Sequence, residues 1–151
     1  MSTKPVDMQE LQERVEKNYA RLCEPYYQFE DVFSDPAYEW PGDKEGRALL
    51  AFVSHYRISG QKIPCMDLMI EAIPQKANQY SYLGHEANDI IDEQQLSGHN
   101  WYLRGLLEYY EQFHDERVLS YAKSTVEHLY YPAKGRFLTY PVERKGTGGG
   151  V

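Results

Sequence analysis

Apolar residues recur every three or four positions along most of the chain, which is the period of α-helices that bury one face. The first run of this kind is Leu11, Val15, Tyr19 and Leu22. Asp7 and Glu10 have the spacing of a capping box in front of this run. Because a proline cannot continue a helix, we predict that this first helix ends at Pro25.

The next part of the chain predicts a loop followed by two helices. Prolines and interleaved acidic and aromatic residues between 26 and 41 indicate a structured loop rather than a helix. A helix then begins near Asp43 and ends at Gly60, a residue typical of helix C-termini. Its apolar stripe is Leu49, Phe52, Val53 and Tyr56. The following helix has Pro64 in its first turn and is expected to stop at Pro74. Its apolar residues are Leu68, Met69 and Ile73.

After a polar and irregular segment, residues 76–91, which predicts a loop, the chain returns to helical spacing. The stretch from Asp92 to Leu119 begins with a cluster of polar groups and continues as an aromatic-rich helix. The apolar side of this helix is Leu96, Leu103, Leu106, Leu107, Tyr110 and Phe113. Asp115 caps a partner helix after a short turn, and Pro132 and Gly135 end it. Its apolar residues are Val118, Ala122, Val126 and Leu129.

One internal repeat connects these helices. The residues from Arg47 to Tyr56 (RALLAFVSHY) match those from Arg104 to Phe113 (RGLLEYYEQF), and each copy is followed by a short turn, a second helix and a proline. Alternation of the strand type occurs only at residues 136–142, and weakly. We therefore predict an all-α fold of tandem αα-hairpins.

Hairpin arrays bury their apolar faces only against neighbouring repeats, so the two predicted hairpins leave open edges. Self-association, or the remainder of a larger array, would cover these edges. We expect one helical-hairpin domain over residues 1–145. Residues 146–151 (GTGGGV) lack the Lys-Ser/Thr pair of a phosphate-binding loop and read as a linker or as the start of a missing region.

Composition restricts the class of partner. The formal net charge of −7 argues against nucleic acid, which proteins bind through clustered Lys and Arg. The chain has neither the apolar run of about 18 residues that a membrane span requires nor an apolar signal-peptide core at its start. Cys23 and Cys65 belong to no paired motif, which suits a reducing compartment, and we expect a cytoplasmic protein. The 14 Tyr and 2 Trp residues suit either a sugar-stacking cleft or an ordinary helical core.

Two helix starts carry the candidate chemistry. Asp43 follows Trp40-Pro41-Gly42 and can cap its helix or offer a carboxylate beside a stacking Trp40. Asp92 holds the equivalent place in the second copy, but the polar residues after it, among them Gln94 and His99, exceed what capping requires. His99 lies on the apolar side of its helix and is expected to point inward, either as a satisfied core residue or as a ligand contact. Gly98 and Gly105 indicate close approach by another helix or by a ligand.

Other chemical motifs are missing from the sequence. The five His residues show no HxxxH or HExxH spacing, so no metal site is predicted. The sequence has no GxSxG motif and no Cys/His pair that marks a nucleophile. Arg47 and Arg104 could hold a carboxylate or a sugar hydroxyl, or could form ion pairs along the flank of each hairpin.

The segments WPGDKEGRALLAF and DEQQLSGHNWYLRGLLEYY, taken together, resemble the N-terminal part of glycoside hydrolase family 127, the bacterial β-L-arabinofuranosidase type. The resemblance extends from about Leu11 to Tyr140 and rests on the two helix starts. It implies a partial (α/α)6 toroid. Members of this family cleave arabinofuranosides with retention, using a zinc-bound cysteine as nucleophile and a glutamate as acid/base. Those groups lie in the later half of the toroid.

The resemblance therefore implies sugar-subsite residues without a catalytic residue or a zinc ligand in this chain. The helix starts should face the mouth of the toroid, where the substrate-binding candidates are Asp92, His99, Asp43, Trp40 and Gln94. Some members have a substrate-contacting histidine at the position that Asp92 occupies here. We expect the N-terminal segment of a glycoside hydrolase acting on L-arabinofuranosides or related plant-type glycans. The alternative is a non-catalytic helical-hairpin module that binds a protein partner.

Overall fold

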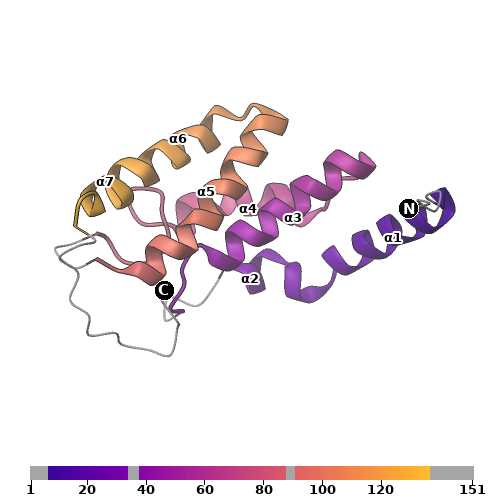
Figure 1. The fold of residues 1–151 in the computed structure, drawn as a ribbon, viewed down its shortest axis with the longest axis horizontal. Coiled ribbons are helices and arrows are strands. Elements are labelled where there is room, and N and C mark those ends of the chain that lie inside the picture. Colours follow the sequence, from indigo (N-terminus) through magenta and orange to yellow (C-terminus); the bar gives the residue numbers. More distant parts are fainter. Residues whose placement is uncertain (1–6, 34–37, 88–90, 137–151) are drawn as a thin grey trace, which may run out of the picture.

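The structure, a computed structural model, describes residues 7–33, 38–87 and 91–136. These residues form helices and no β-strand, which confirms the all-α prediction (Figure 1). The longer helices are α1 (Met8–Leu22), α3 (Asp43–Ser59), α4 (Cys65–Lys76), α5 (Glu93–Phe113) and α6 (Glu116–Thr125). Shorter elements are the 3-10 turn η1 (Pro25–Tyr27), α2 (Phe29–Val32), the π-helical turn η2 (Val126–Tyr130) and α7 (Tyr131–Ala133). The weak strand expected at residues 136–142 and the glycine-rich tail fall almost entirely outside the described residues.

Helices α3 and α5 form the centre of the fold and run in the same direction. Gly42, at the start of α3, lies next to Gly98 near the start of α5. At the other end, Arg57 of α3 forms an ion pair with Glu108 of α5 and donates a hydrogen bond to the backbone carbonyl of Glu108. The two copies of the sequence repeat therefore lie side by side as parallel inner helices, as expected for a hairpin array.

Glycines allow α3 and α5 to approach closely. A Cβ atom at Gly46 would lie 2.0 Å from the carbonyl carbon of Trp101, and one at Gly105 would lie 2.8 Å from the carbonyl oxygen of Gly46. A Cβ atom at Gly98 would lie 2.3 Å from the carbonyl oxygen of Pro41. The prediction that Gly98 and Gly105 mark close backbone approach is thus confirmed, and the neighbour is protein.

Each inner helix is followed by an outer helix that runs back along it. Polar contacts connect the two outer helices to the inner layer and to each other. Tyr109 of α5 donates a hydrogen bond of 3.0 Å to Asp67 of α4. Arg117, in the first turn of α6, lies 2.9 Å from Glu71 of α4 and 2.7 Å from Asp115. The core between these helices includes Phe52, Met66, Ile70, Tyr102 and Leu106, together with Ile63 from the connection between α3 and α4.

Three features of the N-terminal half differ from the sequence prediction. Residues 26–41 are not wholly a loop, because Pro25–Tyr27 and Phe29–Val32 each form a short helical turn that buries Val32. Helix α4 includes Pro74 and continues to Lys76. A proline in the last turn removes only one hydrogen bond, to a carbonyl one turn earlier, so the helix tolerates it there. Leu68 is 50% exposed rather than part of the core.

The last helical segment is continuous but changes its winding. α6 passes through the π-turn η2 into α7, immediately before and around Pro132. Since proline has no N–H to donate, the regular hydrogen-bond series is interrupted at this point. The π-turn places the Tyr130 hydroxyl 2.7 Å from the backbone oxygen of Leu96. The end of the described chain is thereby attached to the start of α5.

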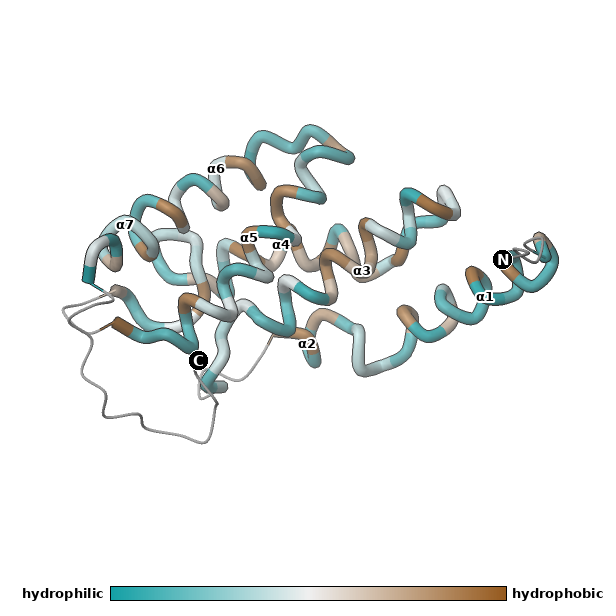
Figure 2. The backbone as a smooth tube through the Cα atoms, in the orientation of Figure 1, coloured by the Kyte–Doolittle hydropathy of each residue, from teal (hydrophilic) through white to brown (hydrophobic). Residues whose placement is uncertain are grey.

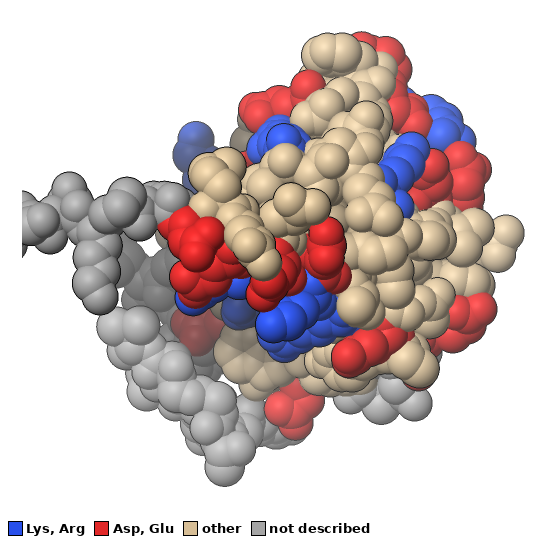
Figure 3. Space-filling model, turned by 90° about the vertical axis from the view of Figure 1, so that its right-hand side faces the viewer, with Lys and Arg blue, Asp and Glu red and all other residues tan. Residues whose placement is uncertain are grey.

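Helix α1 extends away from the inner layer, with its N-terminus at one end of the molecule (Figure 1). Polar residues predominate along it, interrupted by isolated apolar positions (Figure 2). Its main attachment is at its C-terminal end, where Leu22 is buried and Asn18 lies 3.2 Å from Nδ1 of His55 on α3. Met8 and Leu11 remain 70% and 44% exposed. On the face seen from this end, acidic and basic side chains lie next to one another, and other residues cover most of the surface (Figure 3).

Candidate functional site

The N-terminus of α5 is capped in the expected way. The Oδ1 atom of Asp92 accepts a hydrogen bond of 2.9 Å from the backbone N–H of Gln95. Its other oxygen, Oδ2, lies 3.7 Å from Nε2 of His85 in the preceding loop. Asp92 therefore has one oxygen used for capping and another directed to a partly exposed neighbour, with 35% of its side chain accessible.

The loop of residues 77–87 is held against this helix by buried polar contacts. The backbone N–H of Leu83 donates to Nε2 of His99 at 3.0 Å, and Nδ1 of His99 lies 2.7 Å from the backbone oxygen of Gln95. This pattern requires the neutral tautomer with its proton on Nδ1. Burial lowers the pKa of His99 to about 4. His99 is therefore a neutral residue that fixes the loop.

A cleft of about 700 Å³ lies where the starts of α3 and α5 meet this loop and the end of α4. Carboxylates, amides and a tyrosine form much of its wall: Tyr38, Glu39, Glu45, Asp92, Gln94 and Gln95. The loop contributes Leu83, Gly84 and His85, and Lys76 stands at the end of α4. Three carboxylates against one lysine give the cleft an acidic character. A hollow of this size and polarity can accept a small polar ligand.

One buried acceptor in the wall lacks a partner. Gln95 is 1% exposed, and its Nε2 atom donates to the backbone oxygen of His85 at 2.7 Å. Within the described part of the chain, Oε1 of the same amide has no hydrogen-bond donor. This oxygen lies against Gly84, where an added Cβ atom would be 2.9 Å away. Because an unsatisfied buried acceptor costs free energy, Oε1 of Gln95 is a candidate acceptor for a hydrogen bond from water or from a ligand in the cleft.

The structure brings together only part of the predicted set. Asp92 and Gln94 line the cleft. Asp43 instead lines a neighbouring hollow of about 280 Å³ behind Tyr38, where its carboxylate pairs with Arg47 at 2.9 Å. Trp40 is half-buried and lines neither hollow.

The expectation that His99 faces the sugar needs correction. Its side chain is 0% exposed and lies between the rings of Tyr82 and Tyr102, at centroid distances of 5.8 and 5.5 Å. Both ring nitrogens already have backbone partners, so none is left for a ligand. The prediction that His99 points inward is confirmed, and its role is to position the loop.

Several wall residues were not identified from the sequence. Glu45 shows the spacing of a capping-box residue, and its Oε2 accepts from the backbone N–H of Gly42 at 3.1 Å. Tyr38 and Glu39 fall in a stretch without periodicity, and His85 lies in a polar loop, so no local pattern marks them. For Gln95 a signal existed, namely its place within the polar cluster at the start of α5.

The two arginines of the repeat form contacts within the chain. The guanidinium of Arg47 lies 4.1 Å from the centroid of the Trp101 ring, in addition to its pair with Asp43. Arg104 lies 6.0 Å from the same ring and 4.0 Å from Glu108. Both arginines therefore form ion pairs along the flank of the hairpins, which was one of the two roles predicted for them.

The cysteines do not fit a zinc site. Cys65 is 1% exposed and burial raises its pKa to about 11, which disfavours the thiolate that binds zinc. Among residues 7–33, 38–87 and 91–136, no group of three or more His, Cys, Asp or Glu side chains is arranged to hold a metal ion. No helix in these ranges is long and apolar enough to cross a membrane.

Comparison of the chain with models of known protein families, with curated proteins and with solved structures gives no match.

Proposed function

We propose that the cleft at the start of α5 binds a carbohydrate, and that the chain supplies sugar-subsite residues to a glycoside hydrolase that acts on L-arabinofuranosides or related glycans. The partial (α/α)6 toroid belongs to the same proposal. The observation that carries it is the buried Oε1 atom of Gln95 in the cleft wall, which has no hydrogen-bond donor among the described residues.

The wall chemistry suits a neutral polyol. A sugar hydroxyl can donate to Gln95 Oε1 or to a carboxylate, and can accept from the amide of Gln94 at the same time. Tyr38 adds an aromatic ring on which the C–H face of a sugar could pack. An anionic ligand fits less well, because Glu39, Glu45 and Asp92 would repel it.

The proposed role is binding without catalysis by this chain. The buried thiol of Cys65 is held in its neutral form, and Cys23 is half-buried and does not line the cleft. Two of the three cleft carboxylates, those of Asp92 and Glu45, are instead placed at helix starts, where they take part in capping. In this proposal a different segment of the toroid provides the nucleophile and the acid/base.

Titration of the chain with arabinofuranosyl oligosaccharides, followed by amide chemical shifts, tests the proposal. We expect saturable shifts at Gln94, Gln95 and the loop of residues 77–87. Gln94→Ala should weaken binding roughly fivefold to tenfold, as expected for one hydrogen bond of about 1 kcal/mol. Asp92→Asn keeps a capping oxygen and should weaken binding similarly.

The matched control is Gln12→Ala, an exposed glutamine on α1 that bonds only to Glu16 one turn away. It should leave the affinity unchanged. The proposal is wrong if the chain shows no saturable shifts with arabinofuranosyl ligands at roughly 20 mM, a concentration that populates complexes of millimolar Kd. It is also wrong if the shifts saturate but map to residues outside the cleft.

The alternative, a helical-hairpin module that binds a protein, is supported by a different surface. The outer face of α5 and α6 carries an apolar groove at a distance from the cleft.

A further inference from the structure

The groove between α5 and α6 has an apolar floor and an exposed rim. Its volume is about 240 Å³, and its floor is Leu103, Leu107, Leu119, Ala122 and Val126. Leu107 is 43% exposed and Tyr131, at one end, is 65% exposed. Leu119 and Ala122 of α6 and Val126 of η2 recur at intervals of three and four, so they form one continuous stripe facing the two leucines of α5. An apolar stripe that is mostly half-buried, with Leu107 and Tyr131 exposed beside it, is typical of a helix-packing surface.

The internal repeat indicates that this surface is built to be covered. At the repeat offset, Leu103 corresponds to Gly46 and Leu107 corresponds to Leu50 of the first hairpin. In the first hairpin this face of α3 is in backbone contact with α5, through Gly46 and Trp101. In the second hairpin the same face of α5 carries two leucines and is still open among the described residues.

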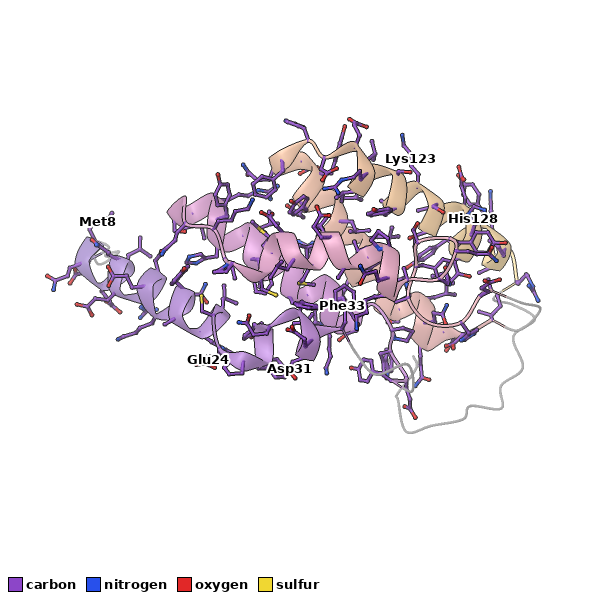
Figure 4. The ribbon with its side chains drawn as sticks, turned by 180° about the vertical axis from the view of Figure 1, so that it is seen from behind. Met8, Glu24, Asp31, Phe33, Lys123 and His128 are labelled. Carbon is purple, nitrogen blue, oxygen red and sulfur yellow. The ribbon has the colours of Figure 1, made fainter. Side chains whose placement is uncertain are left out.

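The charges at the rim show what kind of helix would cover it. Lys123 and Glu127 both line the groove, are one helical turn apart, and are exposed. Lys123 lies on the outer side of α6, away from the body of the molecule (Figure 4). Within the described ranges neither of them forms an ion pair, whereas Arg57, Arg104 and Arg117 all do. When two such helices pack antiparallel, the cation of each helix lies opposite the anion of the other, so the same pair of residues is complementary to itself.

We infer that this groove is the interface of a twofold dimer of the chain. Two copies packed groove to groove bring their α6 helices together in antiparallel orientation. Lys123 of each copy then faces Glu127 of the other, and Leu107 is buried against the second copy's stripe. A twofold axis forms both charge pairs at once, which is why a self-complementary rim favours a second copy over an unrelated partner. This inference does not depend on sugar binding, and it is an alternative to the toroid of the proposed function, whose next hairpin would cover the same face of α5.

Sedimentation equilibrium on the full chain tests the dimer. We expect a mass of twice 17.7 kDa that dissociates on dilution. Leu107→Glu places a charge in the apolar floor and should weaken dimerisation by at least tenfold. The matched control is Ile58→Glu, because Ile58 is 73% exposed on α3 and does not line the groove. It should dimerise like the original chain. Circular dichroism confirms that both variants remain folded.

Charge exchange distinguishes the twofold arrangement from any other contact. Lys123→Glu alone and Glu127→Lys alone each create two repulsive pairs and should weaken the homodimer. An equimolar mixture of these two variants restores both attractive pairs, so a heterodimer should form with the original affinity. The double variant carrying both changes should also dimerise normally. None of these changes lies in the sugar cleft, so saccharide titration should give the same result for each variant.

Three outcomes would overturn the inference. The first is a monomer at every concentration up to roughly 100 µM, which would populate a dimer of micromolar Kd. The second is a dimer that Ile58→Glu disrupts and Leu107→Glu does not. The third is a mixture of the two charge variants that associates no better than either variant alone, which would place α6 outside the interface.

Discussion

The close crossing of α3 and α5 makes Gly46 the most closely packed of the described glycines. In Gly46→Ala the new Cβ atom would lie 2.0 Å from the carbonyl carbon of Trp101, 2.2 Å from the amide nitrogen of Tyr102 and 2.3 Å from the carbonyl oxygen of Trp101. Ordinary contacts of this type begin at 3.4 Å, so the two helices would have to separate by 1.4 Å at this point. All three neighbours are backbone atoms, and no rotamer change can relieve the contact.

The magnitude follows from two opposing effects. Overpacking costs about 1–3 kcal/mol, and a clash with helix backbone belongs at the upper end. Alanine is a better helix former than glycine by about 1 kcal/mol, which offsets part of this cost. We therefore expect Gly46→Ala to lower the free energy of unfolding by about 2 kcal/mol. With a urea m-value of about 2 kcal/mol/M, the unfolding midpoint should fall by about 1 M.

Urea unfolding followed by circular dichroism measures this effect, with two comparison variants. Ser54→Ala adds a helix former on the exposed face of α3 and should change stability by less than about 0.5 kcal/mol. Gly105→Ala meets its nearest atom at 2.8 Å and should fall between Ser54→Ala and Gly46→Ala. If Gly46→Ala is as stable as Ser54→Ala, α3 and α5 do not cross at this distance, and the arrangement of the inner helices is wrong.

Three further predictions concern single side chains. Burial lowers the pKa of His99 from an ordinary 6.5 to about 4. As the pH falls, the unfolded chain therefore protonates this histidine at a higher pH than the folded chain does. About 3 kcal/mol of stability, present above pH 6.5, should therefore be lost towards pH 4, and urea unfolding of His99→Gln should show a flatter pH dependence. Burial raises the pKa of Cys65 to about 11, so a thiol reagent at pH 7.5 should label half-buried Cys23 first, and equal rates in the two single Cys→Ser variants would contradict this. Tyr109→Phe removes the hydrogen bond to Asp67 and should cost about 1 kcal/mol in urea unfolding, whereas a loss below about 0.3 kcal/mol would show that this contact does not hold α5 to α4.

Periodicity predicts the long helices well because each carries a stripe of large apolar residues. The start at Asp43, the end at Gly60 and the caps at Asp7, Asp92 and Asp115 all agree with the structure. The agreement is local, since capping depends on residues within one turn. Where tertiary contacts decide, the prediction is less accurate. Four residues of α2 become helical because Val32 and neighbouring Phe33 can be buried against the core, and no periodicity precedes them.

The glycines carry long-range information that the sequence shows only in part. Gly98 and Gly105 are costly inside a helix, which indicated a close neighbour, but not which neighbour. The structure identifies the neighbour as α3, the equivalent helix of the first hairpin, together with the residues just before it. The cleft was harder to predict, since its wall combines residues from four separate segments and depends on the path of the loop at residues 77–87.

The polar residues at the start of α5 divide into two roles because of helical geometry. Gln95 and His99 are one turn apart on the inner side, where they are 1% and 0% exposed, and both bond to the backbone of the same loop through His85 and Leu83. Asp92 and Gln94 lie on the side that the cleft leaves accessible. The inner pair therefore shapes the wall that the outer pair completes.

A ligand that donates to Oε1 of Gln95 would bind the amide that already holds the loop, so binding should protect the loop against opening. Ligand binding would raise the free energy of unfolding by RT ln(1 + [L]/Kd), about 2.7 kcal/mol at a ligand concentration of about 100 Kd. Loss of this stabilisation in Gln95→Leu, with the fold retained, would connect the buried acceptor directly to the cleft.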